Sequence, residues 1–162
     1  MVILGIDPGL CNIGYGLIKS ENNCINIITS GNFSINSKLS FPERLKSIYD
    51  YIQNLLNNYN PDVMAIENVF VNKNAKVSLK LGHARGVIIL AVINKGIPIT
   101  EYTPREIKQS IVGIGRASKT QIQAMVLHIL NIKNRKLQED EADGLAVAIC
   151  HEFKKNKLGE KI

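Results

Sequence analysis

The amino-acid sequence predicts a single α/β domain built around a mixed sheet. Two short apolar segments, Val2–Asp7 and Val63–Glu67, have the length and composition of buried strands, and each ends in one carboxylate. A strand, helix, strand order with a suitable crossover makes these two strands parallel neighbours. The segments 13–18 and 24–33, joined by a turn at Glu21–Asn23, add an antiparallel meander to the same sheet.

The helix between the two acid-ended strands has clear boundaries. Ser40–Glu43 is a Ser-x-x-Glu capping box, and apolar residues follow at helical spacing until Asn57–Pro61 ends the helix.

A longer helix is expected from Asn74 to Asn94. Within it Gly82 and Gly86 each cost about 1 kcal/mol relative to Ala, which favours close backbone approach by another element. The cations in and before this helix have the pattern of a solvated basic face: Lys73, Lys76, Lys80 and Arg85.

The C-terminal half continues with a strand at 97–100 and a short helix that begins at Thr103-Pro104 and is interrupted at Gly113–Gly115. A second capping box at Ser118–Gln121 opens an amphipathic helix through Leu130. The connection between these helices carries Arg116 and Lys119 beside two glycines, which suits phosphate binding. An ordinary helix–helix connection explains the same residues equally well.

The last helix is expected to begin at Asp140-Glu-Ala-Asp143. Acids in a first helical turn stabilise the helix, which is a sufficient reason for either residue. Asp140 and Asp143 nevertheless share one face of a helix that is otherwise apolar and must lie against the sheet. Glu139 and Glu141 are expected to face solvent, and residues 154–162 to form a loose basic tail after a domain that spans 1–153.

Composition limits the possible functions. The net charge of +6 and the pI near 9.3 favour a polyanionic partner such as nucleic acid. Three cysteines without Cys-x-x-Cys spacing argue against a disulfide framework or a zinc site and fit a reducing cytoplasm. No apolar run is long enough to span a bilayer, so no membrane association is expected.

The acid-ended strands and the last helix together suggest a metal site. Asp7 alone is as well explained by a turn cap, and Glu67 alone by a solvated strand end. Parallel strands place both acids at the carboxyl edge of the sheet, where open α/β folds keep their sites. With Asp140 and Asp143 they form an all-oxygen set, which suits Mg²⁺ or Mn²⁺. Two such ions about 4 Å apart activate the attacking water and stabilise the leaving oxygen in phosphodiester hydrolysis.

Several motifs then appear in the order found in one family. Each is weak alone, because other ribonuclease-H-like and actin-like proteins also open with an apolar strand and an Asp, but in register they are specific. Over residues 1–153 the chain resembles the RuvC family of bacterial Holliday-junction resolvases. The motifs are Gly5–Gly9 with Gly14–Gly16, Ala65–Phe70, Leu79–Gly86, Lys108–Lys119 (KQSIVGIGRASK) and Asp140–Asp143.

This resemblance implies a ribonuclease-H-like fold, with a five-stranded mixed sheet flanked by helices, and a homodimer formed through the helix around 79–86. It implies metal-dependent endonuclease activity that makes symmetric paired nicks in four-way DNA junctions during homologous recombination and repair. RuvA and RuvB are the implied partner proteins. The implied metal ligands are Asp7, Glu67, Asp140 and Asp143, and the implied DNA contacts are Phe70, Lys108 and Lys119.

The chain departs from the family in two places. Small residues are usual at the position of Glu141, and Ala at that of Gly144; we expect altered local charge and helix stability with catalysis retained. The tail is also short. The alternatives are a monomeric ribonuclease-H-like nuclease that processes RNA, which lacks the helix and loop motifs, and a non-enzymatic junction-binding protein, which has no need of a complete acid set.

Overall fold

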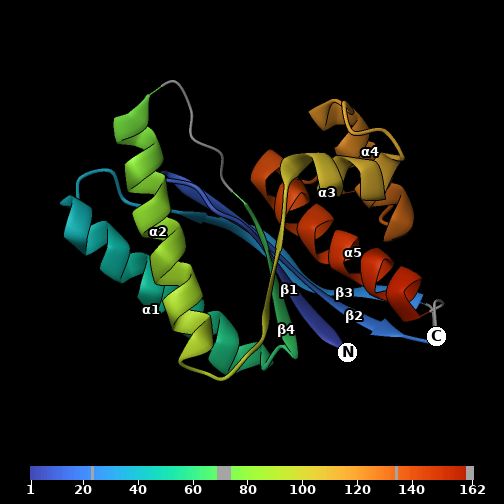
Figure 1. Ribbon diagram of the computed structural model, residues 1–162, viewed down its shortest axis with the longest axis horizontal. Helices are drawn as coiled ribbons and strands as arrows, with labels where there is room; N and C mark the ends of the chain where they lie inside the picture. The colour runs from blue at the N-terminus through green and yellow to red at the C-terminus, as the bar shows by residue number, and fades with distance from the viewer. Residues whose placement is uncertain (23, 69–73, 134, 160–162) are drawn as a thin grey trace.

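The computed structural model describes residues 1–22, 24–68, 74–133 and 135–159 (Figure 1). Within this part of the chain one mixed sheet has the strand order β3-β2-β1-β4-β5. The strands are β1 (Val2–Asp7), β2 (Asn12–Glu21), β3 (Cys24–Ser34), β4 (Val63–Glu67) and β5 (Ile99–Tyr102). The helices are α1 (Phe41–Tyr59), α2 (Ala75–Ile93), α3 (Pro104–Val112), α4 (Lys119–Ile129) and α5 (Glu139–Gly159).

The sheet pairs as the sequence predicts. β1 and β4 are parallel, with Ile6 opposite Ile66, while β1, β2 and β3 form the antiparallel meander. β5 extends the sheet parallel to β4, but it begins two residues later than expected, at Ile99. The reason is local: the amide of Ile97 still closes the end of α2 on Val92, and Pro98 has no N–H to donate.

Helices cover both faces of the sheet. α1 and α2 lie on one side and α3, α4 and α5 on the other (Figure 1). Alternate side chains of β1 pack against the two helical layers: Ile3 on the α5 side, and Leu4 and Ile6 on the α1–α2 side. None of the described helices is long and apolar enough to cross a lipid bilayer.

The first turns of α5 pack directly on the backbone of the sheet. A Cβ added at Gly14 would lie 1.8 Å from the carbonyl oxygen of Asp140, and one at Gly5 would lie 2.3 Å from that of Gly144. Gly144 in turn leaves room for Tyr15, whose backbone would lie 2.6 Å from an added Cβ. The glycines therefore let the helix approach the centre of the sheet, and the Gly144 departure is part of this contact.

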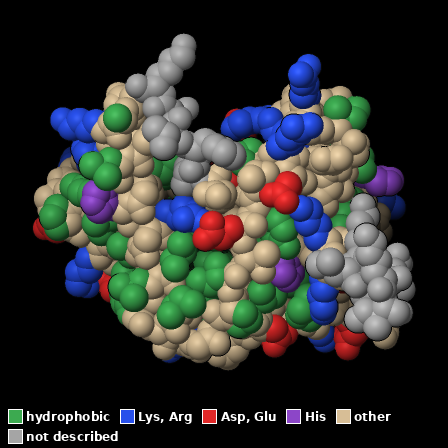
Figure 2. Space-filling model, viewed as in Figure 1, with side chains coloured by type: hydrophobic (Ala, Val, Ile, Leu, Met, Phe, Trp, Pro, Cys, Tyr) green, Lys and Arg blue, Asp and Glu red, His purple; other side chains and the backbone are tan. Residues whose placement is uncertain are grey.

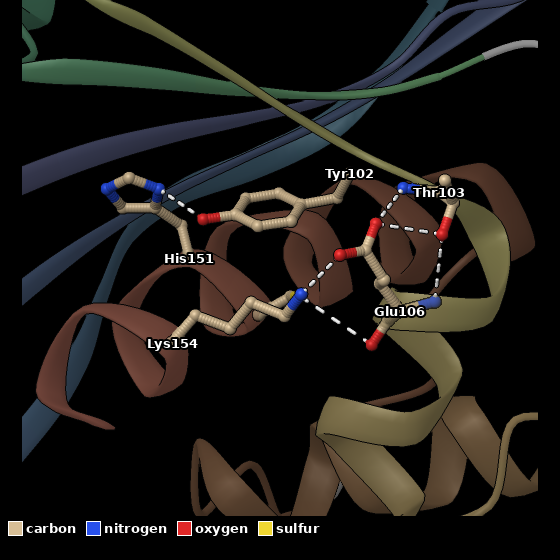
Figure 3. Close-up of polar contacts among 6 residues, drawn as sticks. Tyr102, Thr103, Glu106, His151 and Lys154 are labelled. Carbon is tan, nitrogen blue, oxygen red and sulfur yellow. Dashed lines mark hydrogen bonds and ion pairs between the residues drawn. The ribbon is translucent and has the colours of Figure 1, made fainter. Parts of the chain in front are cut away.

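Polar contacts fix α3 on α5 (Figure 3). The carboxylate of Glu106 accepts from the backbone amide and hydroxyl of Thr103, which forms the predicted cap of α3, and from the ammonium of Lys154 on α5 at 2.5 Å. Tyr102 at the end of β5 and His151 on α5 share a 2.9 Å hydrogen bond. The hydrogen bonds from Lys154 and Thr103 lower the pKa of Glu106 to about 2.

Two expectations about the last helix are wrong. α5 continues to Gly159, so the backbone of 154–159 is helical rather than a loose tail, and Lys154 is held by Glu106. Glu141 does not face solvent: it is 4% exposed, because Ser30, Arg135 and the amide of Gln138 all donate to its carboxylate. Glu139 does face solvent, and Asp140 lies inside the first turn rather than at the cap.

The expected close approach to Gly82 and Gly86 does not occur within the chain. No described atom lies within 4 Å of a Cβ added at either position. α2 otherwise matches its prediction, with Asn74 as a side-chain cap and Asn94 at its end.

A candidate metal centre at the edge of the sheet

The two strand-end acids are neighbours. Asp7 and Glu67 each directly follow a residue of the parallel pair Ile6–Ile66, so both lie at the carboxyl edge of the sheet. The apolar residues before them are fully buried and fix the strands, whereas both acids are half-buried. The predicted placement of this pair is therefore found in the structure.

Asp140 and Asp143 come to the same edge from the start of α5, which packs on one face of the sheet. The carbonyl of Asp140 rests on Gly14, which is the β2 residue opposite Asp7. One carboxylate oxygen of Asp140 accepts a 3.2 Å hydrogen bond from the amide nitrogen of Asn32 on β3. Asp143 lies one turn further along α5, with its side chain 22% exposed.

The other three acids all act on the pKa of Asp7. Burial is the largest cause that raises the pKa of Asp7, to about 8, and repulsion from Glu67, Asp143 and Asp140 adds to it in that order. The pKa of Glu67 is raised to about 7, first by burial and then by Asp143. Burial also raises the pKa of Asp143. Carboxylates so placed favour a bound cation, because the cation removes their mutual repulsion.

Lys119 is one of two described lysines that act on this site. Its ammonium is paired with Glu139 and lies 3.7 Å from an oxygen of Asp143, and it lowers the pKa of Asp7 and of Glu67. Lys108 also lowers the pKa of Glu67. Both lysines line a small cavity of about 100 Å³ with Glu67 and Asp143.

The donor set fits a hard divalent cation, although the side chains are not gathered around one point. Within the described ranges no three Asp, Glu, His or Cys side chains are already arranged to hold an ion. The electrostatic coupling of Asp7 to the other three acids shows that they are close neighbours all the same. Like charges without a counter-ion repel, so side-chain rotation toward a cation is the expected response. The four acids offer carboxylate oxygens, which suit Mg²⁺ or Mn²⁺.

Three residues near this edge were not found from the sequence as part of the site. Asn32 holds Asp140, while Ser30 and Arg135 hold Glu141 in the same helical turn. Ser30 and Asn32 are about a hundred residues away from their partners, and no local pattern marks such a pairing. Phe70, expected to stack on DNA bases, lies outside the described residues.

The strand order and the two helical layers are those of the ribonuclease-H-like class, and the acids lie at the carboxyl edge of its sheet. Residues 3–151 match the family model described as crossover junction endodeoxyribonuclease RuvC. The RuvC protein of Alkaliphilus oremlandii is 49% identical over 151 residues, which cover 93% of this chain and 92% of that protein.

Solved structures agree with this match. The RuvC structure from Thermus thermophilus superimposes with a TM-score of 0.88 at 28% identity, over 97% of this chain and 96% of that one. The T. thermophilus RuvC solved in complex with a Holliday junction substrate gives a TM-score of 0.87 at 26% identity, over the same shares of the two chains. The chain belongs to the RuvC family, and it is a crossover junction endodeoxyribonuclease.

Proposed function

We propose that this enzyme hydrolyses phosphodiester bonds in four-way DNA junctions with two divalent metal ions held by Asp7, Glu67, Asp140 and Asp143. The observation that carries the proposal is that Asp7 and Glu67 follow the parallel pair Ile6–Ile66, while the start of α5 packs on Gly14, the residue opposite Asp7. Burial, with repulsion from Glu67, Asp143 and Asp140, also raises the pKa of Asp7. Asp7 lies on the central strand and is therefore the proposed bridging ligand. Bound Mg²⁺ would activate the attacking water and stabilise the leaving oxygen.

The residues around the acids have separate roles in this proposal. Lys119 and Lys108 line the cavity beside Glu67 and would hold the DNA strand near the phosphate that is cut. Lys119 is 66% exposed, so its ammonium is free to move from Glu139 to a phosphate. Phe70 remains the proposed base-stacking residue by family resemblance.

We also propose that two copies of the chain form the working enzyme through α2. Leu79, Leu90 and Ile93 are each more than half exposed on this helix. Leu79 and Leu90 line a groove of about 670 Å³ that includes both Gly82 and Gly86. A second copy packed here would bury the apolar side chains and account for glycines that no described residue approaches. Two active sites related by symmetry would make paired nicks in strands of like polarity.

The biological setting follows from the family. T. thermophilus RuvC was solved in complex with a Holliday junction substrate, which supports the same substrate here. Recombination and repair in the bacterial cytoplasm, with RuvA and RuvB as partners, complete the proposal. The net charge of +6 agrees with a nucleic-acid substrate.

A cleavage assay tests the proposed substrate. The protein and Mg²⁺ are incubated with a mobile four-way DNA junction, with a duplex of the same sequence and with structured RNA, and the products are mapped on denaturing gels. We expect paired nicks in two junction strands of like polarity and no cut in the duplex or the RNA. Cleavage of RNA alone would instead favour the RNA-processing alternative. Asp7→Asn is the control, and it should bind the junction without cutting it.

A further inference from the structure

A basic pocket lies where α3 ends and the chain turns toward α4. Its volume is about 640 Å³, and no described acid lines it. Figure 2 shows lysine and arginine side chains gathered over this part of the molecule. The lining residues are Thr103, Pro104, Arg105, Lys108, Ile114, Gly115 and Arg116.

The two arginines of the pocket carry charges that no described acid neutralises. Arg105 and Arg116 are exposed, and neither forms an ion pair with a described residue. Two other cations of this half of the chain differ in this respect: Lys154 is paired with Glu106, and Lys119 with Glu139. The pocket therefore has an unbalanced positive charge that suits an anion.

The pocket is also held in shape. Arg105 and Lys108 are three residues apart on α3 and share one face of it. α3 itself is fixed by the bonds of Glu106 to Thr103 and Lys154 (Figure 3). Gly115 packs against Arg105, since a Cβ there would lie 2.9 Å from the Arg105 Cγ. Arg105 thus projects from an anchored helix and is constrained by the following loop.

The pocket continues into the candidate metal centre. Pro104 and Lys108 line both the basic pocket and the cavity that contains Glu67 and Asp143. Asp143 and Lys119 then line a further hollow of about 510 Å³ that includes Lys136. The three hollows therefore adjoin one another beside the acids, and a series of phosphates spaced along a strand fits them better than a single small anion.

We infer that Arg105 and Arg116 bind a backbone phosphate of the DNA strand beyond the phosphate that is cut, and so set the position of that strand over the acids. Guanidinium groups match the geometry of phosphate oxygens and remain charged at any physiological pH. This inference rests on the proposed junction substrate. The pocket contributes affinity and positioning, while the chemistry stays with the acids.

Salt-dependent binding tests the inference. Junction affinity is measured in EDTA, where metal-dependent cleavage is blocked, between 50 and 200 mM salt for Arg105→Gln, Arg116→Gln and the corresponding Lys variants. Each Gln variant should weaken binding roughly tenfold at low salt and make the slope of log affinity against log salt about 0.9 smaller. Each Lys variant should keep the slope. Lys46→Gln, which removes an exposed cation of α1 paired with Asp50, is the matched control and should change neither quantity.

The possible outcomes separate this inference from the proposed function. If the wild-type protein binds the junction and the Gln variants retain its affinity and slope, the pocket does not hold a phosphate, although the junction proposal stands. If the wild-type protein fails to prefer the junction over duplex, the junction proposal itself fails. Equal losses in Lys46→Gln would show a general charge effect and would also overturn the assignment of the pocket.

Discussion

At the scale of single residues, the candidate metal centre is a set of acids held where they repel one another. Asp7 and Glu67 ionise only near neutral pH, because burial and neighbouring carboxylates disfavour their charged forms. The partly exposed Lys119 compensates for part of this repulsion. Such a site is costly to the empty protein and favourable to a cation, which is the balance that a metal-dependent enzyme needs.

Metal binding should therefore release protons. Since the pKa of Asp7 is raised to about 8 and that of Glu67 to about 7, Mg²⁺ must displace protons from both at neutral pH. We expect Mg²⁺ affinity to fall as pH is lowered from 8 to 6, by roughly tenfold per pH unit for each proton displaced. Calorimetry in two buffers with different ionisation enthalpies measures the protons released. A binding enthalpy independent of the buffer would contradict the raised pKa values.

Asp7→Asn should stabilise the metal-free protein at pH 8. A carboxyl whose pKa is higher in the folded than in the unfolded state costs stability above its unfolded pKa of 3.8 and costs nothing below it. Removing it raises the melting temperature by about 2–4 °C for each kcal/mol recovered. The gain should shrink as pH falls from 8 toward 4. Thermal unfolding in EDTA measures it, and a loss of stability at pH 8 would show that Asp7 is a structural cap instead.

At the scale of elements, the decisive contact is that of α5 with the β1–β2 pair. Glycines at positions 5, 14 and 144 remove the side chains that would separate helix and sheet. The buried Glu141 then joins the first turn of α5 to Ser30 on β3 and to Arg135. The helix start, and with it Asp140 and Asp143, is thus positioned by backbone packing and by one buried ionic network.

Gly14→Ala should displace the start of α5. The added methyl group would overlap the carbonyl of Asp140, so we expect a loss of about 1–3 kcal/mol in the free energy of unfolding. We also expect Mg²⁺ affinity to fall, because Asp140 moves with the start of the helix. Ser20→Ala, at the opposite end of β2, is the control for a change in the same strand. Chemical denaturation and metal titration of both variants measure the two effects. Unchanged metal affinity in a folded Gly14→Ala protein would separate Asp140 from the metal site.

The sequence predicts the elements better than the contacts between them. Capping residues such as Ser40, Thr103 and Ser118 act within one turn, and the structure confirms the helices that they begin. The position of Glu141 depends on Ser30, which lies on a distant strand, and local patterns cannot reveal that pairing. The pairing of Asp7 with Glu67 was predictable because parallel strands bring their ends to one edge of the sheet.

At the scale of the whole molecule, the two helical layers differ in what they leave exposed. The α3–α5 side has the acids, the neighbouring Lys108 and Lys119, and the basic pocket. The α2 side has exposed leucines and isoleucine around an apolar groove. The first surface suits DNA and the second suits another copy of the chain, so two copies joined through α2 would present two active sites to one junction.

Leu79→Glu should therefore dissociate the proposed dimer. Leu79 is 65% exposed in this chain, so the substitution leaves the fold intact but places a charge in the apolar contact. Analytical ultracentrifugation at micromolar concentration should show a wild-type dimer and a variant monomer. Ile114→Glu is the control, since Ile114 is 60% exposed but lies beyond α3. A wild-type monomer, or equal dissociation by both variants, would argue against α2 as the interface.

Anomalous diffraction from a crystal soaked in Mn²⁺ tests the metal centre most directly. We predict two peaks about 4 Å apart at the carboxyl edge of β1 and β4. Asp7 should contact both ions, and Glu67, Asp140 and Asp143 should complete the ligands. A single peak, or peaks that leave out Asp7, would contradict two-metal hydrolysis at this site.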